Sequence, residues 1–534
     1  MPTDNNRDRI KDERGHHQAT YLAAGRATVI IISLTFFSKV LALSKEIFTA
    51  DVFGTSPELD VFNIAFAIPG LLSLVIASAV QAVLVPLYFE WRQKNSPKGV
   101  NERLSSVIIF CICLIVILTT ACVFTANYYF PLVGFGLDET MSALGEHIEQ
   151  QLALIILLEG SAALFAGVLQ AWKMFSAISL AQSFANIFLI LFLLLFREWG
   201  VWLMVYGSLA GSLGKLIFLV AATAKTGRLT IRVLPFQWRE CRVFLSLSLP
   251  LLGADLIANA NLLVDQSIAS SLEAGSVSAL RYAFRLNDLP SQLLFTAIAQ
   301  AIFPYISEQV ADLDYAGLRY IFYRSILFIA IFAIPTTIYV EFHALDIVTA
   351  LLKRGAFDDE SVKNTALCLQ LYALGLSFIA YSFINGAFFT AMKYVKSLLY
   401  IGLLSLVLNA LLDLLFIKLF GGVHGVALSS SVISLVVGLL FFSLLRRRLR
   451  LSMTASEIRS LLIPVLASAV AFAACAVILP WMSSLPVWPR LILSSVLFFA
   501  VYTGVMFGFR TKEIGDAMGG GLLKIWRGRR NSSA

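Results

Sequence analysis

Residues 59–90 read LDVFNIAFAIPGLLSLVIASAVQAVLVPLYFE, a long and mainly apolar run that indicates the fold class. Its only charged side chains, Asp60 and Glu90, stand beside its two ends. A helix needs roughly 20 consecutive, mainly apolar residues to cross a bilayer. The stretch therefore predicts a membrane-spanning helix, and Pro69 and Gly70 inside it permit a bend.

The same pattern returns farther along the chain. Ala65-Phe66 is followed twenty residues later by Pro86, and Ala283-Phe284 is followed by Pro304 at the same distance. A Gln-Ala pair precedes each proline, at Gln81-Ala82 and at Gln300-Ala301. The copies stand six apolar segments apart and hence run in the same direction. They predict two parallel six-helix halves, related by an axis along the membrane normal, that give alternating access to a site between them.

Fourteen apolar segments of spanning length fill most of the 534 residues. They cover approximately residues 24–50, 59–90, 104–129, 150–172, 177–196, 200–223, 243–271, 276–307, 318–341, 363–391, 395–417, 422–445, 457–480 and 487–509. Hydrophobic residues make up 58% of the chain and charged residues only 14%. This composition predicts an all-α polytopic membrane protein of about 14 helices, with two six-helix lobes and two further C-terminal helices.

The loops between the segments are short, so the expected organisation follows the helices. We expect an N-terminal tail over 1–23, an N-lobe over 24–223, a linker over 224–242, a C-lobe over 243–445, helices 13 and 14 over 446–509, and a basic tail over 510–534. The longest external connection, about residues 342–362, is expected to cap one face.

The net charge of +8 reflects membrane topology rather than nucleic-acid binding. Most of the 41 Lys and Arg residues fall in alternate connections and in the two tails. By the positive-inside rule, both termini are predicted to lie in the cytoplasm. The basic C-terminal tail is expected to contact anionic membrane lipids. The chain has no nucleotide-binding or zinc-protease motif, which argues against an ATPase or another enzyme.

Two of the segments carry paired cations. Lys39 and Lys45 stand in the first, and Arg281 and Arg285 stand one turn apart in the eighth. A central Lys or Arg costs roughly 2.5–3.5 kcal/mol in lipid, so these side chains are expected to face a shared polar passage for an anion. Guanidinium groups bind phosphate oxygens bidentately.

Nearby acids leave other interpretations open for these cations. Glu46 lies beside Lys45, which can also snorkel to the interface, and Asp288 lies one turn beyond Arg285 as an ion-pair partner. Asp60 could pair with one of the cations or gate the outer side.

A second polar group contains only oxygen ligands. Asp255 stands in the seventh segment, while Asn409 and Asp413 share one face of the eleventh. Two carboxylates and an amide suit a hard cation such as Na⁺. A proton carried by Asp255 or Asp413, or simple hydrogen bonding between helices, remains an alternative.

Several stretches resemble one known family. They are Phe36-Phe37-Ser38-Lys39-Val40-Leu41, Asp51-Val52-Phe53-Gly54, Asp60-Val61-Phe62, Gly275-Ser276-Val277-Ser278, Arg281-Tyr282-Ala283-Phe284-Arg285-Leu286 and Arg354-Gly355-Ala356-Phe357. These stretches are similar to the MviN/MurJ lipid II flippases of the multidrug/oligosaccharidyl-lipid/polysaccharide exporter superfamily.

The resemblance implies fourteen helices in two lobes and export of an undecaprenyl-diphosphate-linked saccharide. It makes Arg285 the retained arginine of helix 8 and matches Asp60 to the acid at the head of helix 2. It also implies a Na⁺ coupling site on Asp255, Asn409 and Asp413, completed by the Val426 carbonyl and the Ser430 hydroxyl. The chain departs from the family where Lys39 and Lys45 replace arginines and Ser73 replaces a helix-2 arginine, which loses forked phosphate recognition.

The leading hypothesis is a flippase for a polyprenyl-diphosphate-linked glycan such as lipid II, working beside glycan-assembly enzymes. Lys39, Lys45 and Arg285 would hold the diphosphate with the support of Arg281. An exopolysaccharide or O-antigen repeat unit is the alternative cargo. A drug/cation antiporter of the same superfamily and a non-transporting scaffold are the alternatives of other classes.

Overall fold

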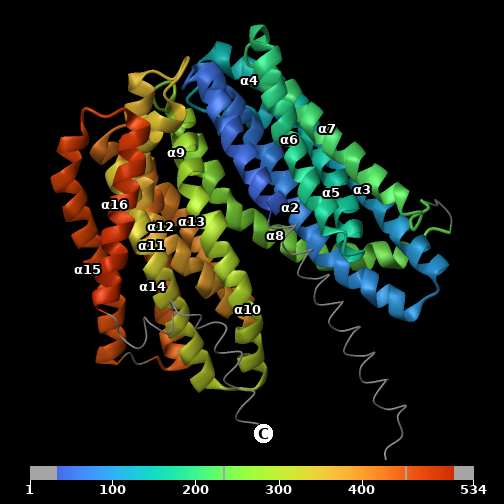
Figure 1. Ribbon diagram of the computed structural model, residues 1–534. Coiled ribbons are helices and arrows are strands. Elements are labelled where there is room, and N and C mark those ends of the chain that lie inside the picture. Colours follow the sequence, from blue (N-terminus) through green and yellow to red (C-terminus); the bar gives the residue numbers. More distant parts are fainter. Residues whose placement is uncertain (1–32, 232–234, 452–453, 510–534) are drawn as a thin grey trace, which may run out of the picture. The chain divides into compact units, whose positions relative to one another are not determined.

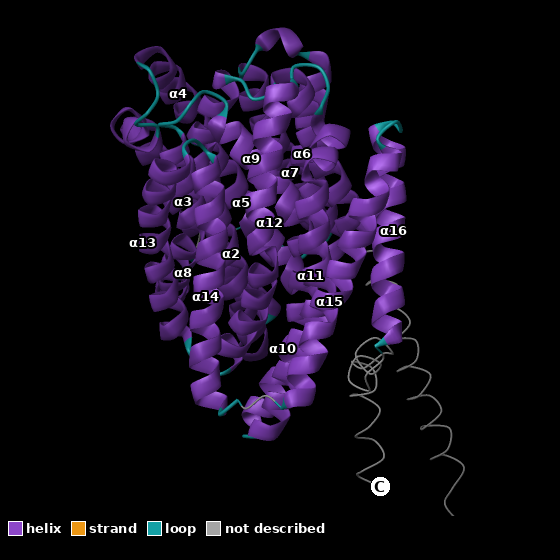
Figure 2. Cartoon of the chain, turned by 90° about the vertical axis from the view of Figure 1, so that its left-hand side faces the viewer, coloured by secondary structure: helices purple, strands orange, loops and turns teal. Residues whose placement is uncertain are grey.

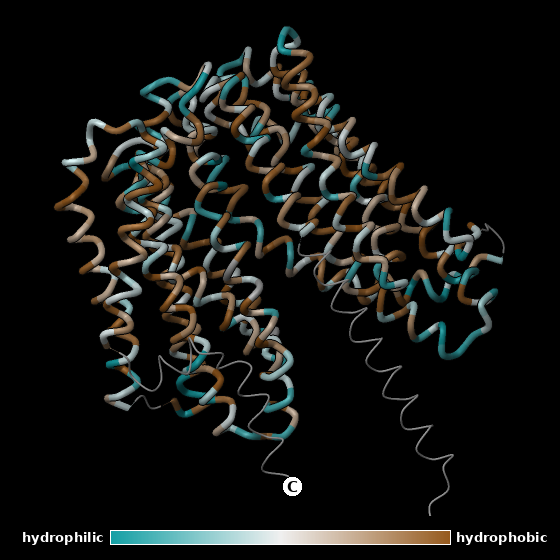
Figure 3. Tube along the Cα trace, viewed as in Figure 1, coloured by the Kyte–Doolittle hydropathy of each residue, from teal (hydrophilic) through white to brown (hydrophobic). Residues whose placement is uncertain are grey.

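The structure is a computed structural model that describes residues 33–231, 235–451 and 454–509 (Figure 1). Within these ranges the chain forms helices joined by short loops, and no strand is present (Figure 2). Apolar residues run along the helices, and polar residues gather toward their ends and connections (Figure 3). The predicted all-α membrane fold is therefore confirmed.

The described part of the chain contains twelve helices long and apolar enough to span a membrane, or thirteen if one bent pair is counted as a span. The twelve are α2 (Pro57–Lys94), α3 (Pro97–Val133), α4 with α5 (Glu139–Leu152 and Leu154–Ala171), α6 (Phe175–Leu195), α7 (Trp202–Lys225), α8 (Trp238–Ala269), α11 (Tyr315–Leu352), α12 (Asp359–Ala391), α13 (Val395–Phe420), α14 (His424–Leu449), α15 (Ala455–Ile478) and α16 (Val487–Gly508). Residues 33–53 are also helical, whereas 24–32 of the first predicted segment lie outside the described ranges. The predicted number of about fourteen spanning helices therefore agrees approximately with the twelve or thirteen found in the described residues.

The chain divides into two compact units. The first unit ends at Val52 and resumes over Val61–Leu256, and the second comprises Phe53–Asp60 and everything from Ile257 onward. In the first unit α7 packs against α5 and α6, and α3 packs against α5. In the second, α12 packs against α9, α11 and α14, and α13 packs against α14. The lobe limits expected from the sequence stay a prediction.

The connection between α7 and α8 is fastened to the first unit by side chains. Glu240 accepts a hydrogen bond from the Trp91 indole over 2.9 Å and forms an ion pair with Arg103. The Asn101 amide donates to the Thr230 carbonyl over 2.6 Å and accepts from the Thr230 N–H over 3.0 Å. The stretch expected to be a simple linker is therefore held against α2 and α3.

The eighth predicted segment, 276–307, is broken rather than continuous. It forms α9 (Ser276–Pro290), a π-helical turn η2 (Ser291–Phe295) and α10 (Thr296–Ala311), with a bend of 44°. Pro290 at the break cannot donate a backbone hydrogen bond, and its ring clashes with the preceding turn. The bend therefore follows directly from the sequence.

Two connections are shorter than the sequence suggested. Helix α4 occupies residues predicted to be a loop; it begins at Asp138, whose side chain caps the Met141 N–H over 2.7 Å. Helix α11 continues to Leu352, so the expected 342–362 loop is wrong and the loop covers only 353–358. Asp358 caps the next helix, α12: the Ser361 N–H donates to its carboxylate and lowers its pKa.

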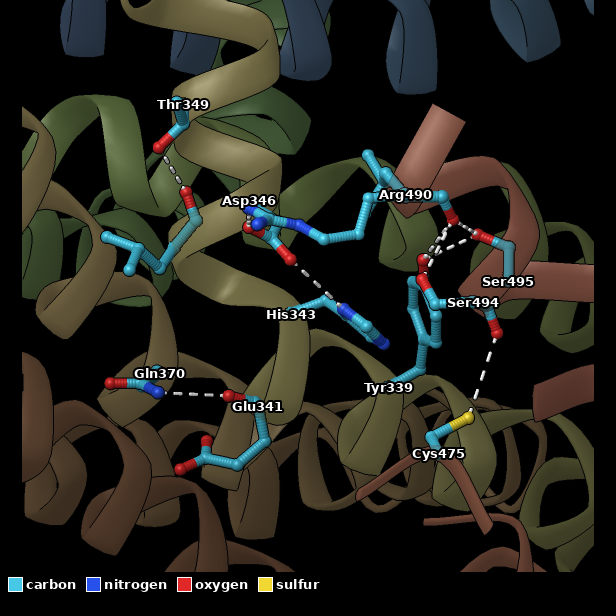
Figure 4. A network of polar contacts seen from close by, with 12 residues as sticks. Tyr339, Glu341, His343, Asp346, Thr349, Gln370, Cys475, Arg490, Ser494 and Ser495 are labelled. Atoms are coloured by element: carbon cyan, nitrogen blue, oxygen red, sulfur yellow. Dashed lines mark hydrogen bonds and ion pairs between the residues drawn. The ribbon is translucent and has the colours of Figure 1, made fainter. Parts of the chain in front are cut away.

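Polar contacts join the last two helices to α11 (Figure 4). The Asp346 carboxylate of α11 pairs with Arg490 of α16 and lies 3.6 Å from the His343 ring. Apolar packing continues the interface, and the Tyr502 hydroxyl donates to the Ile331 carbonyl over 2.7 Å. Charged side chains within a membrane are costly unless they are paired. The Asp346–Arg490 pair therefore favours one position of α16 against α11.

Candidate functional site

The cations of the first helix belong to the first unit. Lys45 forms an ion pair of 2.7 Å with Glu46, and the two side chains are 18% and 13% exposed. Lys39 stands about two turns earlier in the same helix and is half-buried. The structure thus supports the paired interpretation for Lys45.

The arginines of the eighth segment lie on α9, in the second unit. Arg281 and Asp288 are half-buried and Arg285 is exposed. The two arginines are four residues apart on one face of α9, and their binding to one diphosphate stays a prediction. A passage shared with Lys39 stays a prediction.

Asp60 caps α9. Its carboxylate accepts the backbone N–H groups of Gly275 and Ser278, each over 2.7 Å, and the side chain is buried. Helix N-termini present unpaired N–H groups and a partial positive charge, which a carboxylate satisfies. Asp60 therefore positions the helix that carries the two arginines, and a direct role in binding substrate stays a prediction.

The family-like motifs meet around this cap. A side chain at Gly54 would run into the Ala356 carbonyl, and one at Gly275 would approach the Thr55 carbonyl to 2.6 Å. The Phe357 ring is buried edge-on against Tyr282 of α9, with ring centroids 5.5 Å apart. Residues 53–60, the start of α9 and the 353–358 loop therefore pack together in the second unit. These contacts give the family-like motifs a structural role and do not assign them to the substrate.

Oxygen-rich side chains gather where α8, α13 and α14 meet. Asn409 donates from its amide to Asp265 and, over 3.3 Å, to Asp413. The Ser430 hydroxyl donates to Asp265 over 3.0 Å, and Ser429 donates to Asp413 and, over 2.9 Å, to the Val426 carbonyl. We call Asp265, Asn409, Asp413, Ser429, Ser430 and the Val426 carbonyl the oxygen cluster.

Four of the five residues expected to hold Na⁺ are in this cluster, and the remaining position is filled by Asp265 rather than Asp255. Asp255 stands ten residues earlier in α8, roughly 15 Å along the helix axis, in the first unit. In the sequence, Asp265 is an acid within the seventh apolar segment without an evident partner. Asn261, one turn before it, also contacts α13 through Ser405 over 3.3 Å, so this face of α8 lies against α13.

The donor set of the oxygen cluster fits a hard cation. Asp265 and Asp413 are 5% and 0% exposed, and among the described residues neither forms an ion pair with a Lys or Arg. Two adjacent buried carboxylates repel each other unless a proton or a cation neutralises them. The amide, the hydroxyls and the backbone carbonyl each have oxygen lone pairs suited to Na⁺.

A further ion pair in the first unit was missed by the sequence reasoning. The Lys215 ammonium of α7 lies 2.6 Å from the Glu159 carboxylate of α5, and the side chains are 22% and 20% exposed. Glu159 has no evident partner in the sequence, because Lys215 lies 56 residues farther along the chain, on a helix that does not directly follow α5. The pair satisfies both charges inside the helical bundle.

Comparisons with known proteins agree with this geometry. A model of the family "Lipid II flippase MurJ" matches residues 49–499. A probable lipid II flippase MurJ of Buchnera aphidicola is 27% identical over 91% of this chain and 97% of its own length. The lipid II flippase MurJ of Burkholderia cenocepacia is 25% identical over 79% of this chain and 84% of its own.

Solved structures show the same fold. Lipid II flippase MurJ in an inward closed conformation matches with a TM-score of 0.77 at 23% identity, covering 90% of this chain and 98% of the other. An inward-facing multidrug resistance MATE-family transporter of the MOP superfamily matches with a TM-score of 0.67 at 13% identity, over 79% and 98% of the two chains. Because the family model matches most of this chain, the chain belongs to the lipid II flippase MurJ family.

Proposed function

We propose that this multi-pass membrane transporter moves lipid II, or a close undecaprenyl-diphosphate-linked relative, from the cytoplasmic to the outer leaflet by alternating access. The observation that carries the proposal is the family match over residues 49–499, which includes α9 with its two arginines. The relatives that match at the level of sequence bear the name lipid II flippase. This favours lipid II over an exopolysaccharide repeat unit as cargo.

The basic side chains would bind the diphosphate. Arg281 and Arg285 offer planar groups that can each donate hydrogen bonds to two phosphate oxygens, while Lys39 offers a compact point charge. Lys45 is already paired with Glu46 at 2.7 Å, so it would contribute only when that pair opens. Asp60 would act indirectly, by holding the start of α9 through its two hydrogen bonds.

The oxygen cluster would bind a Na⁺ coupling ion. Its ligands would be Asp265, Asn409, Asp413, Ser430 and the Val426 carbonyl. Asp265 would take the place of Asp255 among the ligands expected from the sequence. A bound Na⁺ would supply the positive charge that two adjacent buried carboxylates lack. Both termini would lie in the cytoplasm, and ion binding or the membrane potential would return the protein to its starting state.

Arginine substitutions test the transport proposal. Arg285→Ala should abolish growth in a strain depleted of its own lipid II flippase, and Arg285→Lys should retain part of the activity because the charge persists without the fork. Arg319→Ala is the matched control, since Arg319 is an exposed arginine at the start of α11. Membrane levels of each variant are measured by immunoblot.

The cargo is tested separately with purified protein. Proteoliposomes that contain labelled lipid II should show protein-dependent exposure of the label at the opposite leaflet, and Arg285→Ala should remove it. Full growth and undiminished lipid II translocation by Arg285→Ala would contradict the proposal. Translocation of an O-antigen lipid carrier but not of lipid II would contradict the cargo alone.

A further inference from the structure

Tyr372 of α12 lies between the oxygen cluster and α9. The residue is 3% exposed, and its hydroxyl is buried without a hydrogen bond of normal geometry among the described residues. That hydroxyl lies beside the Ser430 hydroxyl without reaching normal hydrogen-bond geometry, and Asp265 and Asp413 are its charged neighbours. A buried phenol hydroxyl that lacks a well-formed hydrogen bond is costly, because it has lost its bonds to water. An additional ligand in the cluster would give it a partner.

The backbone around Tyr372 is held rigidly against α14. The Ser431 hydroxyl donates to the Leu371 carbonyl over 2.5 Å and to the Tyr372 carbonyl over 3.3 Å. One turn later, a side chain at Gly375 would lie 2.8 Å from the same hydroxyl. Helices approach this closely in membranes through small residues and hydroxyl groups. Ser431 follows Ser429 and Ser430 directly, so the position of Tyr372 is tied to the cluster itself.

The ring of Tyr372 contacts α9 on its other side. It packs edge-on against Phe284, with ring centroids 5.9 Å apart and an interplanar angle of 70°. Phe284 stands directly before Arg285 and one turn after Arg281, and α9 packs along α12. A shift of the Tyr372 ring would therefore displace Phe284 and with it α9, the helix that carries both arginines.

We propose that Tyr372 is a positioning residue that couples the oxygen cluster to the arginines of α9. The Tyr372 hydroxyl would turn toward an ion bound in the cluster. The ring would move with the hydroxyl and shift Phe284. The inference rests on the proposed binding of Na⁺ to the cluster. Because coupling between two sites is reciprocal, Na⁺ should raise the affinity for lipid II by the same factor by which lipid II raises the affinity for Na⁺.

Thermal unfolding of the purified full-length protein tests the hydroxyl. NaCl should raise the melting temperature above that in choline chloride at the same concentration, because a ligand of the folded state stabilises it. Tyr372→Phe keeps the ring but removes the hydroxyl, and it should need about tenfold more NaCl for the same rise. Asp413→Asn should abolish the difference between the two salts.

The same helix offers a matched control. Tyr381 also has a buried hydroxyl without a partner of normal geometry, and its ring packs edge-on against Phe322 with centroids 6.4 Å apart. Tyr381→Phe should leave the NaCl dependence unchanged. An identical NaCl titration for Tyr372→Phe and the wild type, with Asp413→Asn still deficient, would overturn the role of Tyr372 alone. A wild type equally stable in both salts would overturn Na⁺ binding and the coupling together.

Lipid II binding tests the ring contact. Phe284→Leu should keep the NaCl-dependent rise in melting temperature while losing most of the difference in lipid II affinity between NaCl and choline chloride. Phe322→Leu, which disrupts the control pair, should preserve that difference. A Phe284→Leu protein whose lipid II affinity still responds to Na⁺ as the wild type does would refute transmission through this contact.

Discussion

The Asp60 carboxylate accepts the backbone N–H of Gly275 over 2.7 Å, although 215 residues separate the two in the chain. The bond joins the first turn of α2 to the N-cap residue of α9, within one compact unit. A second bond to the Ser278 N–H completes the cap. The acid at the head of α2 therefore determines where the arginine-bearing helix begins.

Removing the cap should destabilise the protein without removing a phosphate ligand. Asp60→Ala leaves two buried N–H groups unsatisfied and should cost about 2 kcal/mol of stability. Asp60→Asn keeps one acceptor oxygen and should cost less. The measurement is the apparent melting temperature in detergent at a fixed scan rate. Equal melting temperatures for Asp60→Ala and the wild type would show that the cap contributes no stability.

Gly275 should tolerate no side chain. Its φ is +89°, and a methyl group would lie 2.6 Å from the Thr55 carbonyl, so Gly275→Ala should cost about 1–3 kcal/mol. Gly504→Ala in α16 is the control, because nothing lies within 4 Å of the added methyl group. That control should be neutral or slightly stabilising, since Ala favours the helix. Comparable melting temperatures for the two variants would argue against the strain.

The Asp346–Arg490 pair should hold α16 in place. Arg490→Ala leaves a largely buried carboxylate without its partner and should cost about 3 kcal/mol, whereas the double change Asp346→Asn with Arg490→Ala should recover part of that loss. Lys353→Ala removes an exposed pair with Asp359 and should cost less than about 1 kcal/mol. Thermal unfolding of the wild type, Arg490→Ala, Asp346→Asn and the double variant gives the coupling energy, and strictly additive losses would exclude an interaction.

Lys39 should accept arginine. Lys39→Arg keeps the positive charge and adds a forked donor group, so transport should equal or exceed that of the wild type. Lys39→Met keeps the length but removes the charge and should reduce transport about tenfold or more. Complementation with graded expression and lipid II translocation in proteoliposomes measure both. Normal transport by Lys39→Met would remove this lysine from the diphosphate site.

The sequence predicted the helices well because long apolar runs leave the backbone no alternative in lipid. It failed where a helix is neither long nor apolar. Helix α4 contains Glu146, His147 and Glu149 within 14 residues, and its start depends on the cap by Asp138. The extension of α11 to Leu352 was missed because Asp346 resembles a loop residue until Arg490 is placed beside it.

The candidate site was predictable in kind but not in every residue. The i,i+4 spacing of Asn409 and Asp413 correctly placed both on one face of α13. Spacing within α8 could not show whether Asp255 or Asp265 faces that helix, because this depends on the rotation and height of α8 against its neighbour. Tyr372 gave no signal at all, since a tyrosine in an apolar helix is ordinarily a packing residue.

The chain passes from the first unit into the second for only eight residues, Phe53–Asp60, before returning. A polypeptide divided at Leu256 would consequently carry this short piece on the wrong fragment. The C-terminal fragment would then expose the N–H groups that Asp60 satisfies and would depend on its companion to complete α9.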